Sequence, residues 1–379
     1  MSAIQNKSWL FTPGPITTSM ATKEAMLHDW GSRDASFIQT NVRVRERLLD
    51  LVDAAQTHVC VPVQGSGTFA IEATLGTMIK KTDKALVLIN GAYGKRIARI
   101  LKILDRPFDV IETPEDVPND VTLLKTKIQN DPTITHIIAV HCETTSGILN
   151  PIEEISRITA NSGRKLIIDA MSSFGALPLS NNNIQFEAVV ASSNKCLEGV
   201  PGLGFALIEK QALERTEGNS PSLCLDLYDQ WKSMEANDQW RFTPPTHVIA
   251  ALDSALDQLV NEGGRLGRQQ RYQNNCTLLV KGMRALGFET LLPDNLQAPI
   301  IVTFKTPSDP DFEFEAFYSA LKQLGYVIYP GKLTVVDSFR IGCIGQVGEE
   351  QILGLLDAVN ILAEGYKTLK KPNKLTNKQ

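Results

Sequence analysis

Short apolar runs rich in β-branched residues alternate with amphipathic stretches from about residue 57 onward. Seven of these runs are candidate strands, and several of them are continuous in apolar residues, which is typical of strands buried on both faces. Strands that alternate with helices in this way indicate a mostly parallel sheet covered by helices. The candidate strands are THVCVPV, KALVLIN, PFDVIET, THIIAVHC, RKLIIDAM, FEAVVASS and GLGFALIE.

Helices are predicted between and after these strands. The stretch PIEEISRITANSG has Pro151 near its start and Gly163 at its end, as helices prefer. A longer helix is predicted by THVIAALDSALDQLVNEGG, whose apolar residues recur at helical spacing before two glycines. Beyond it the pattern predicts a smaller α+β unit, with the order helix, strand PIIVTF, helix FEFEAFYSALKQLG, strands YVIYP and SFRIGCI, and helix EEQILGLLDAVNILAEG.

We therefore expect an α/β protein of two domains. The length of 379 residues supports this division, because single cores usually split beyond roughly 250–300 residues. The predicted limits are an N-terminal arm at 1–20, a large domain at 21–262, a small C-terminal domain at 263–366 and a disordered tail at 367–379.

Composition and charge narrow the function. The chain is 43% hydrophobic and 21% charged, as in an ordinary globular protein. Its formal net charge of -4 argues against a broad nucleic-acid or anionic-membrane surface, so an anionic ligand must be held locally. We expect a cytoplasmic protein, because the start MSAIQNKSWLFTPGP does not resemble a secretory signal. The six cysteines form no Cys-x-x-Cys pair, and no metal site is predicted.

A candidate anion site lies in the segment VPVQGSGTFAIEATLG, where a strand passes through a glycine-rich turn into a helix. The first N–H groups of a helix have no partner within the helix, and Ser66, Gly67 and Thr68 could bring them close to a phosphate. A purely structural turn remains an alternative. The dinucleotide fingerprint fails for want of its third glycine, and GAYGK is too short for a phosphate loop, so a monophosphate is the ligand that fits.

Two further strands end in polar residues at the expected carboxyl edge of the sheet. Asp169 ends one of them, and a buried carboxylate there requires either a structural arginine or a cationic ligand such as a protonated heterocycle. Lys195 follows the next strand, where it is either a surface cation or a partly buried amine whose lowered pKa would make it a Schiff-base nucleophile. A phosphate cradle, an acid and such a lysine are the groups that pyridoxal phosphate requires.

Ten collinear motifs, the last of them in two segments, carry a resemblance to a known family. Over nearly its whole length the chain resembles the class V aminotransferases of the fold-type I pyridoxal-phosphate superfamily. The segments are TPGPITTS, HDWGSRD, QGSGTFAIEA, NGAYGKR, ETTSGILNPIEEI, DAMSSFGALP, SSNKCLEGVPG, DLYDQW, WRFTPPTH, and YPGK with FRIGCIG. The resemblance implies pyridoxal 5'-phosphate as cofactor and a homodimer with active sites at the subunit interface. It also implies transfer of the amino group of 2-aminoethylphosphonate to pyruvate, giving phosphonoacetaldehyde and L-alanine in phosphonate catabolism.

The resemblance also implies roles for individual residues. Lys195 would form the Schiff base and move protons, Asp169 would pair with the ring nitrogen of the cofactor, and Arg340 would bind the anionic group of each substrate. The other cofactor-binding positions implied are Ser66, Gly67, Thr68, Tyr93, Thr145, Ser193, Asn194, and Thr243 of the partner subunit. Further substrate contacts are expected from Gly14, Thr18 and Arg33. From the residues alone, Tyr93 could instead be a core aromatic and Arg340 part of a surface ion pair.

Two other functions remain open at this point. Another class V transaminase, acting on alanine or serine with glyoxylate or pyruvate, would share the same cofactor residues. A non-catalytic regulator could retain the fold without the reaction. A desulfurase is disfavoured, because it needs a mobile nucleophilic cysteine and Cys196 lies directly beside the lysine.

Overall fold

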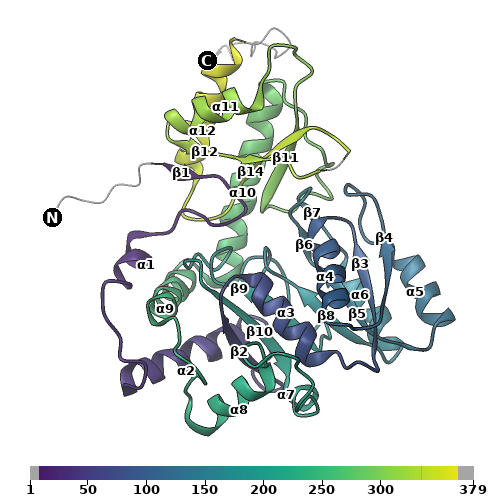
Figure 1. Cartoon of the computed structure of the whole chain (residues 1–379). Coiled ribbons are helices and arrows are strands. Elements are labelled where there is room, and N and C mark those ends of the chain that lie inside the picture. Colours follow the sequence, from purple (N-terminus) through teal and green to yellow (C-terminus); the bar gives the residue numbers. More distant parts are fainter. Residues whose placement is uncertain (1–7, 334, 366–379) are drawn as a thin grey trace.

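A computed structural model describes residues 8–333 and 335–365 of the chain (Figure 1). Its main element is a seven-stranded sheet made of β2 (His58–Gln64), β3 (Lys84–Ile89), β4 (Phe108–Glu112), β5 (Ile134–Val140), β8 (Lys165–Asp169), β9 (Ala188–Ser192) and β10 (Leu203–Glu209). The strand order is β2-β10-β9-β8-β5-β3-β4, and β10 alone runs antiparallel to its neighbours among these described strands. The predicted seven-stranded, mostly parallel sheet is therefore confirmed.

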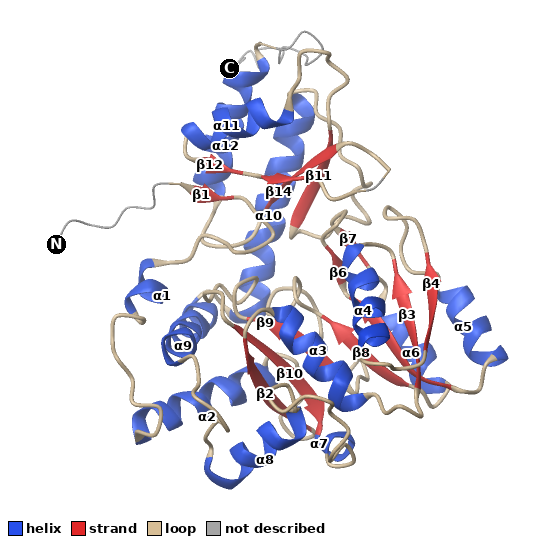
Figure 2. Ribbon diagram, in the orientation of Figure 1, coloured by secondary structure: helices blue, strands red, loops and turns tan. Residues whose placement is uncertain are grey.

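Helices cover both faces of this sheet (Figure 2). One face packs against α2 (Ala35–Asp50), α5 (Val121–Asn130), α6 (Ile152–Asn161) and α9 (Thr246–Asn261), and the other against α3 (Gly67–Met78), α4 (Ala92–Ile103) and α8 (Leu227–Asn237). Alternate residues of a single strand enter the two cores, with Leu86 and Leu88 on one face and Ala85 and Val87 on the other. Burial of both faces explains the continuous apolar runs in the sequence.

A second, smaller layer follows the large sheet in the chain. It contains α10 (Gly264–Ala285), β11 (Ile301–Lys305), α11 (Phe314–Gln323), β12 (Tyr326–Val327), β13 (Tyr329–Pro330), β14 (Ser338–Gly342) and α12 (Glu349–Ala363). The strands β11, β14 and β13 form an antiparallel sheet with its own apolar core, in which Phe304 and Phe339 stack. This order of elements is the one predicted from the sequence. The domain limits stay predictions, and the tail at 367–379 lies outside the described residues.

The N-terminal segment joins the two layers. Its first strand, β1 (Trp9–Leu10), pairs with β12, and Phe11 packs in the core of the small sheet. The chain then passes Lys195 and reaches α1 (Met20–Glu24), which packs against α9. The remaining elements are β6 (Cys142–Glu143), β7 (Ile148–Leu149) and α7 (Lys210–Leu213). Within the described ranges, none of the helices is both long enough and apolar enough to cross a membrane.

Candidate active site

A cavity of about 150 Å³ lies at the carboxyl edge of the large sheet. Its wall contains the turn after β2, the ends of β8 and β9, and the first turns of α3 and α4. The lining residues are Ser66, Gly67, Thr68, Ile71, Tyr93, Arg96, Ile97, Asp169, Met171, Ser192, Asn194 and Lys195. The structure thus brings together seven of the residues predicted from the sequence: Ser66, Gly67, Thr68, Tyr93, Asp169, Asn194 and Lys195.

The N-terminus of α3 forms one wall of the cavity. Ser66 is its N-cap residue, but its hydroxyl makes no capping hydrogen bond, so the first N–H groups of the helix remain available. A Cβ atom at Gly67 would lie 2.3 Å from the sulfur of Met171, so only glycine fits without displacing that side chain. Arg96 donates a hydrogen bond of 3.1 Å to the Thr68 hydroxyl. Free amides, a helix dipole and a nearby cation make this wall suitable for a phosphate.

Asp169 is the last residue of β8 and is only 5% exposed. Its Oδ1 accepts a hydrogen bond of 3.0 Å from the N–H of Met171, and no described lysine or arginine forms an ion pair with it. Burial is the main reason that its pKa rises to about 6. The structural-arginine alternative is therefore not found in the described part of the chain, and the carboxyl group can receive a cationic ligand.

Lys195 lies opposite the N-terminal segment. Its ammonium donates a hydrogen bond of 2.8 Å to the carbonyl oxygen of Pro13. Gly14 packs so closely that an added Cβ would lie 3.1 Å from Lys195 Cγ, and its φ of +118° also favours glycine. Burial lowers the pKa of Lys195, while Cys196 and Asp169 oppose this shift. The lysine is thus held at the cavity in an environment that favours the neutral amine.

Tyr93 reaches the cavity from the first turn of α4, which a buried carboxylate caps. Glu143 accepts hydrogen bonds from the N–H of Tyr93 at 3.0 Å and from the Thr145 hydroxyl at 2.6 Å. The Thr145 hydroxyl also accepts from the N–H of Ala92 at 3.0 Å. Burial raises the pKa of Glu143, which is fully enclosed. Thr145 therefore supports the start of α4 and is not among the residues that line the cavity, while its role toward the cofactor stays a prediction.

Several other predicted residues also lie away from the cavity wall. The Ser193 hydroxyl is buried and donates to the carbonyl oxygen of Val200, while the preceding Ser192 lines the cavity instead. Thr18 is buried in the N-terminal segment, where its carbonyl oxygen accepts a hydrogen bond from a lysine. Arg33 and Thr243 are exposed and lie outside this cavity.

Arg340 lies on β14 and is 2% exposed, so it is not part of a surface ion pair. Its Nε donates to the carbonyl oxygen of Pro330 at 3.0 Å, and its Nη1 donates to that of Thr144 at 2.7 Å. Its guanidinium stacks over the ring of Tyr329, with 5.0 Å between Cζ and the ring centroid. Burial lowers the pKa of Arg340, and nearby Tyr93 is among the groups that oppose the shift.

Sequence reasoning missed a buried network that holds the segment after Lys195. Glu198 accepts hydrogen bonds from Arg271 at 2.7 Å, Tyr272 at 2.6 Å and Gln346 at 2.7 Å. Its φ of +60° is in the left-handed region, which is uncommon for a residue other than glycine. The network fastens the lysine-bearing loop to α10 and to the loop after β14. No sequence signal identifies this network, because the partners of Glu198 are separated from it by 73 to 148 residues along the chain.

Sequence reasoning also missed Arg96, although a signal was present. Arg96 follows Tyr93 by three residues in NGAYGKR, a spacing that places both side chains on one face of a helix. The Cζ of Arg96 lies 5.0 Å from the centroid of the Tyr93 ring. A helix prediction for this segment would therefore have brought the arginine to the same wall.

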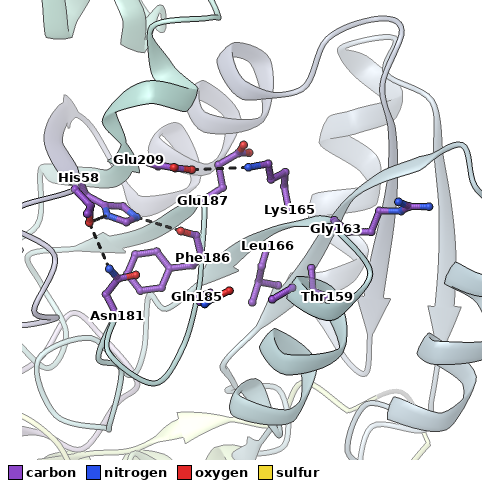
Figure 3. A pocket seen from close by; sticks show the side chains of 13 residues that line it. His58, Thr159, Gly163, Lys165, Leu166, Asn181, Gln185, Phe186, Glu187 and Glu209 are labelled. Carbon is purple, nitrogen blue, oxygen red and sulfur yellow. Dashed lines mark hydrogen bonds and ion pairs between the residues drawn. The ribbon is translucent and has the colours of Figure 1, made fainter.

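A larger cavity of about 370 Å³ lies at the opposite, amino-terminal edge of the sheet (Figure 3). Several of its polar groups interact with neighbouring groups of the protein. Both ring nitrogens of His58 have hydrogen-bond partners, and Lys165 lies 3.9 Å from Glu209. None of the predicted site residues lines this cavity. Among the described residues, no group of three or more histidine, cysteine, aspartate or glutamate side chains is arranged to hold a metal ion.

Comparisons with known proteins agree with this geometry. The family model "Aminotransferase class-V" matches residues 19–332. A 2-aminoethylphosphonate--pyruvate transaminase of Pseudomonas putida is 53% identical over 361 residues, which is 95% of this chain and 97% of that protein. A second protein of that name, from Burkholderia lata, is 53% identical over 350 residues, covering 92% of this chain and 93% of the relative.

Solved structures show the same fold at lower identity. Pyridoxamine-pyruvate aminotransferase from Mesorhizobium loti has a TM-score of 0.86 at 23% identity, covering 97% of this chain and 96% of that one. Alanine--glyoxylate aminotransferase from Nostoc sp. also has a TM-score of 0.86, at 21% identity, covering 95% of this chain and 97% of that one.

Proposed function

Because the chain belongs to the class V aminotransferases, we propose that it transfers the amino group of 2-aminoethylphosphonate to pyruvate, giving phosphonoacetaldehyde and L-alanine. The observation that carries the proposal is the convergence of Lys195, Asp169 and the N-terminus of α3 on one cavity. The two relatives named for this reaction, both 53% identical over more than nine-tenths of the chain, support the choice of substrates.

Enzymes of this family use pyridoxal 5'-phosphate, and it is the cofactor of this chain. The cavity residues fit it: Ser66, Gly67 and Thr68 at the start of α3 would hold the phosphate, and Tyr93 would lie beside the ring. The buried Asp169 carboxyl, which has no cationic partner among the described residues, would hold the ring nitrogen. When bound, the cofactor supplies an aldehyde and an electron-withdrawing ring that stabilises a carbanion.

Lys195 is suited to act as both nucleophile and proton carrier. Burial lowers the pKa of its amine, so more of the neutral, reactive form is present near neutral pH than for an exposed lysine. With its amine free, Lys195 would act as a general acid–base group that moves a proton to or from the substrate carbon, a role worth roughly 10²- to 10⁴-fold in rate. Asp169 would keep the ring nitrogen protonated by forming a buried charge pair with it.

Arg340 would bind the anionic group of each substrate in turn. The donor carries a phosphonate and the acceptor a carboxylate, so one cation must serve both half-reactions. A buried guanidinium can form paired, charge-assisted hydrogen bonds to either group. In the described residues Arg340 has only backbone carbonyls as hydrogen-bond partners, which supports a charge left for a substrate.

The proposal includes a cytoplasmic homodimer with sites at the subunit interface. Exposed Thr243 and Arg33 would then contribute to the partner's site, together with nearby apolar surface. Phe242, next to Thr243, is 50% exposed, and Phe69, beside the cradle, is 51% exposed. Exposed aromatic side chains of this kind support an interface there. All six cysteines are free, which fits a reducing compartment.

The decisive assay supplies 2-aminoethylphosphonate as the only amino donor and pyruvate as the only acceptor. We expect stoichiometric L-alanine and phosphonoacetaldehyde, and none with Lys195→Ala. A parallel reaction with L-alanine and glyoxylate tests the alternative class V activity. Turnover only in the parallel reaction would overturn the substrate assignment. A purified protein that binds no cofactor would favour the non-catalytic alternative.

A further inference from the structure

Two cationic side chains, those of Lys332 and Arg96, contact the ring of Tyr93, and the buried Arg340 lies nearby. The Nζ of Lys332 lies 4.6 Å from the ring centroid, and the Cζ of Arg96 lies 5.0 Å from it. Lys332 and Arg340 come from the small sheet, on the turn after β13 and on β14 respectively. Tyr93 itself lines the cavity that contains Lys195. Positive charge from the small sheet therefore gathers at the cofactor cavity.

These cations have no anionic partners in the described part of the chain. No carboxylate there forms an ion pair within 4.0 Å of Lys332, Arg96 or Arg340, whereas Arg271, for example, pairs with Glu198 at 2.7 Å. Glu143 is close to Tyr93, but its oxygens accept hydrogen bonds from the first turn of α4 and from Thr145. The excess positive charge is thus left for an anion that enters the site.

Arg340 alone has limited capacity for a phosphonate. Its Nε and Nη1 already donate to backbone carbonyl oxygens, so the free edge of the guanidinium centres on Nη2. A carboxylate has two oxygens and one negative charge. A phosphonate has three oxygens and, like a phosphate monoester, more than one negative charge near neutral pH. A second cation is required to match it.

Lys332 is placed to be that cation. The turn that carries it is tight, because a Cβ atom at Gly331 would lie 2.1 Å from the carbonyl oxygen of Ser338. Its ammonium is a compact charge with three rotatable donors, which could reach the phosphonate oxygens that Arg340, with Nε and Nη1 already engaged, leaves unpaired. A contact over an aromatic ring is weak enough to be exchanged for an ion pair.

We propose that Lys332 is a specificity-determining residue, which binds the phosphonate group of the amino donor together with Arg340 and contributes little to the carboxylate of the acceptor. This inference rests on the function proposed above. It explains how one site can accept two anions of different charge: Arg340 binds both groups, and Lys332 adds the charge that only the phosphonate needs.

The test measures binding of two amine-free analogues to the cofactor-loaded enzyme. Ethylphosphonate is the donor without its amino group, and propionate is L-alanine without its amino group. We expect Lys332→Met to raise the Kd of ethylphosphonate about 10- to 100-fold, as for one lost charge-assisted hydrogen bond, and the Kd of propionate less than about 3-fold. Lys332→Arg, which keeps the charge, should restore ethylphosphonate binding to within about 5-fold of wild type.

The matched control is Lys322→Met on α11, an exposed lysine of the same layer, which should change neither Kd. Equal weakening of both analogues by Lys332→Met would overturn the proposal, because it would show a general role in closing the site. An unchanged Kd for ethylphosphonate would overturn it as well. Wild-type turnover of 2-aminoethylphosphonate is scored separately, so failure of the proposed function is distinguished from failure of this inference.

Discussion

Burial shifts the pKa values of two ionisable residues at the cavity in opposite directions. Burial raises the pKa of Asp169 to about 6 and lowers the pKa of Lys195, so each group is driven toward its neutral form. A neutral amine is what nucleophilic attack requires. A carboxyl group that is costly to ionise without a partner gains most from a cationic ring nitrogen.

The shift at Asp169 makes a prediction for the cofactor-free protein. The folded-state pKa of about 6 lies above the ordinary value of 3.8, so the carboxyl group lowers the unfolding free energy as pH rises from about 4 to about 6. Asp169→Asn removes this cost and should raise the unfolding free energy by about 1–3 kcal/mol at pH 8. Urea unfolding at a series of pH values measures the difference.

The same series of unfolding measurements at different pH values includes a control and can contradict the prediction. Wild type and Asp169→Asn should converge below about pH 4, where the wild-type carboxyl group is protonated in both states. Asp116→Asn, at an exposed loop position, should show no such pH-dependent difference. A variant that is less stable than wild type at pH 8 would contradict the inferred burial cost.

Two helices begin at the cavity, and they use their N-termini differently. Glu143 and Thr145 satisfy the first N–H groups of α4, so that terminus serves to position Tyr93. The N-terminus of α3 has no side-chain cap from Ser66 and faces the cavity instead. Only the second arrangement leaves donors for a phosphate.

Because the N-terminus of α3 faces the cavity, substitution of Gly67 tests whether this helix terminus binds the cofactor. Alanine in place of glycine ordinarily favours a helix by up to about 1 kcal/mol. At position 67, however, the new Cβ would lie 2.3 Å from the Met171 sulfur, so Met171 would have to move within a cavity of about 150 Å³. We expect Gly67→Ala to weaken cofactor binding at least about 10-fold, measured by absorbance titration of the cofactor-free protein.

A second glycine of the same helix provides the control. A Cβ atom at Gly76 would make only an ordinary contact, 3.5 Å from Pro221, so Gly76→Ala should leave cofactor affinity unchanged. Replacing Met171 with alanine in the Gly67→Ala background should recover most of the lost affinity. If that double variant binds no better than Gly67→Ala, displacement of Met171 is not the cause.

At the scale of the whole molecule, the sequence predicted elements better than side-chain environments. Most of the seven strands are visible because burial of both faces leaves continuous apolar runs, whereas in the edge strand β4 only Ile111 is buried. Asp169 and Lys195 could be placed together because parallel strands end at a common edge. Neighbouring residues of an extended chain point to opposite sides, so Ser192 lines the cavity while the Ser193 hydroxyl donates to Val200, a difference that sequence pattern alone does not show.

Contacts between distant segments could not be predicted from local pattern. Thr145 caps a helix that begins 53 residues earlier, and Arg340 donates to a carbonyl oxygen 196 residues away. The pairing of Glu198 with Gln346 is of the same kind. Such contacts depend on how the two layers meet, which periodicity does not encode.

Thr243 is exposed and does not line the cavity of its own subunit, so it can bind the cofactor only as part of the partner subunit's site. In a symmetric dimer each subunit would then provide its own Lys195 and lend Thr243 to the other. Thr243→Asp should abolish activity by repelling the phosphate, as Lys195→Ala does by removing the amine. Each variant alone is therefore expected to be inactive.

Mixed dimers of these two variants distinguish the possible arrangements. In a heterodimer, one site combines an intact Lys195 with an intact Thr243 from the opposite subunit, while the other site has neither. Equal mixing of subunits should therefore restore about a quarter of the wild-type activity, because half of the dimers are mixed and half of their sites are intact. Co-expression with two different affinity tags allows the mixed dimer to be isolated and assayed. If Thr243 served the site of its own subunit, every site would carry one defect and no activity would return. A monomer in sedimentation equilibrium would refute the shared site directly.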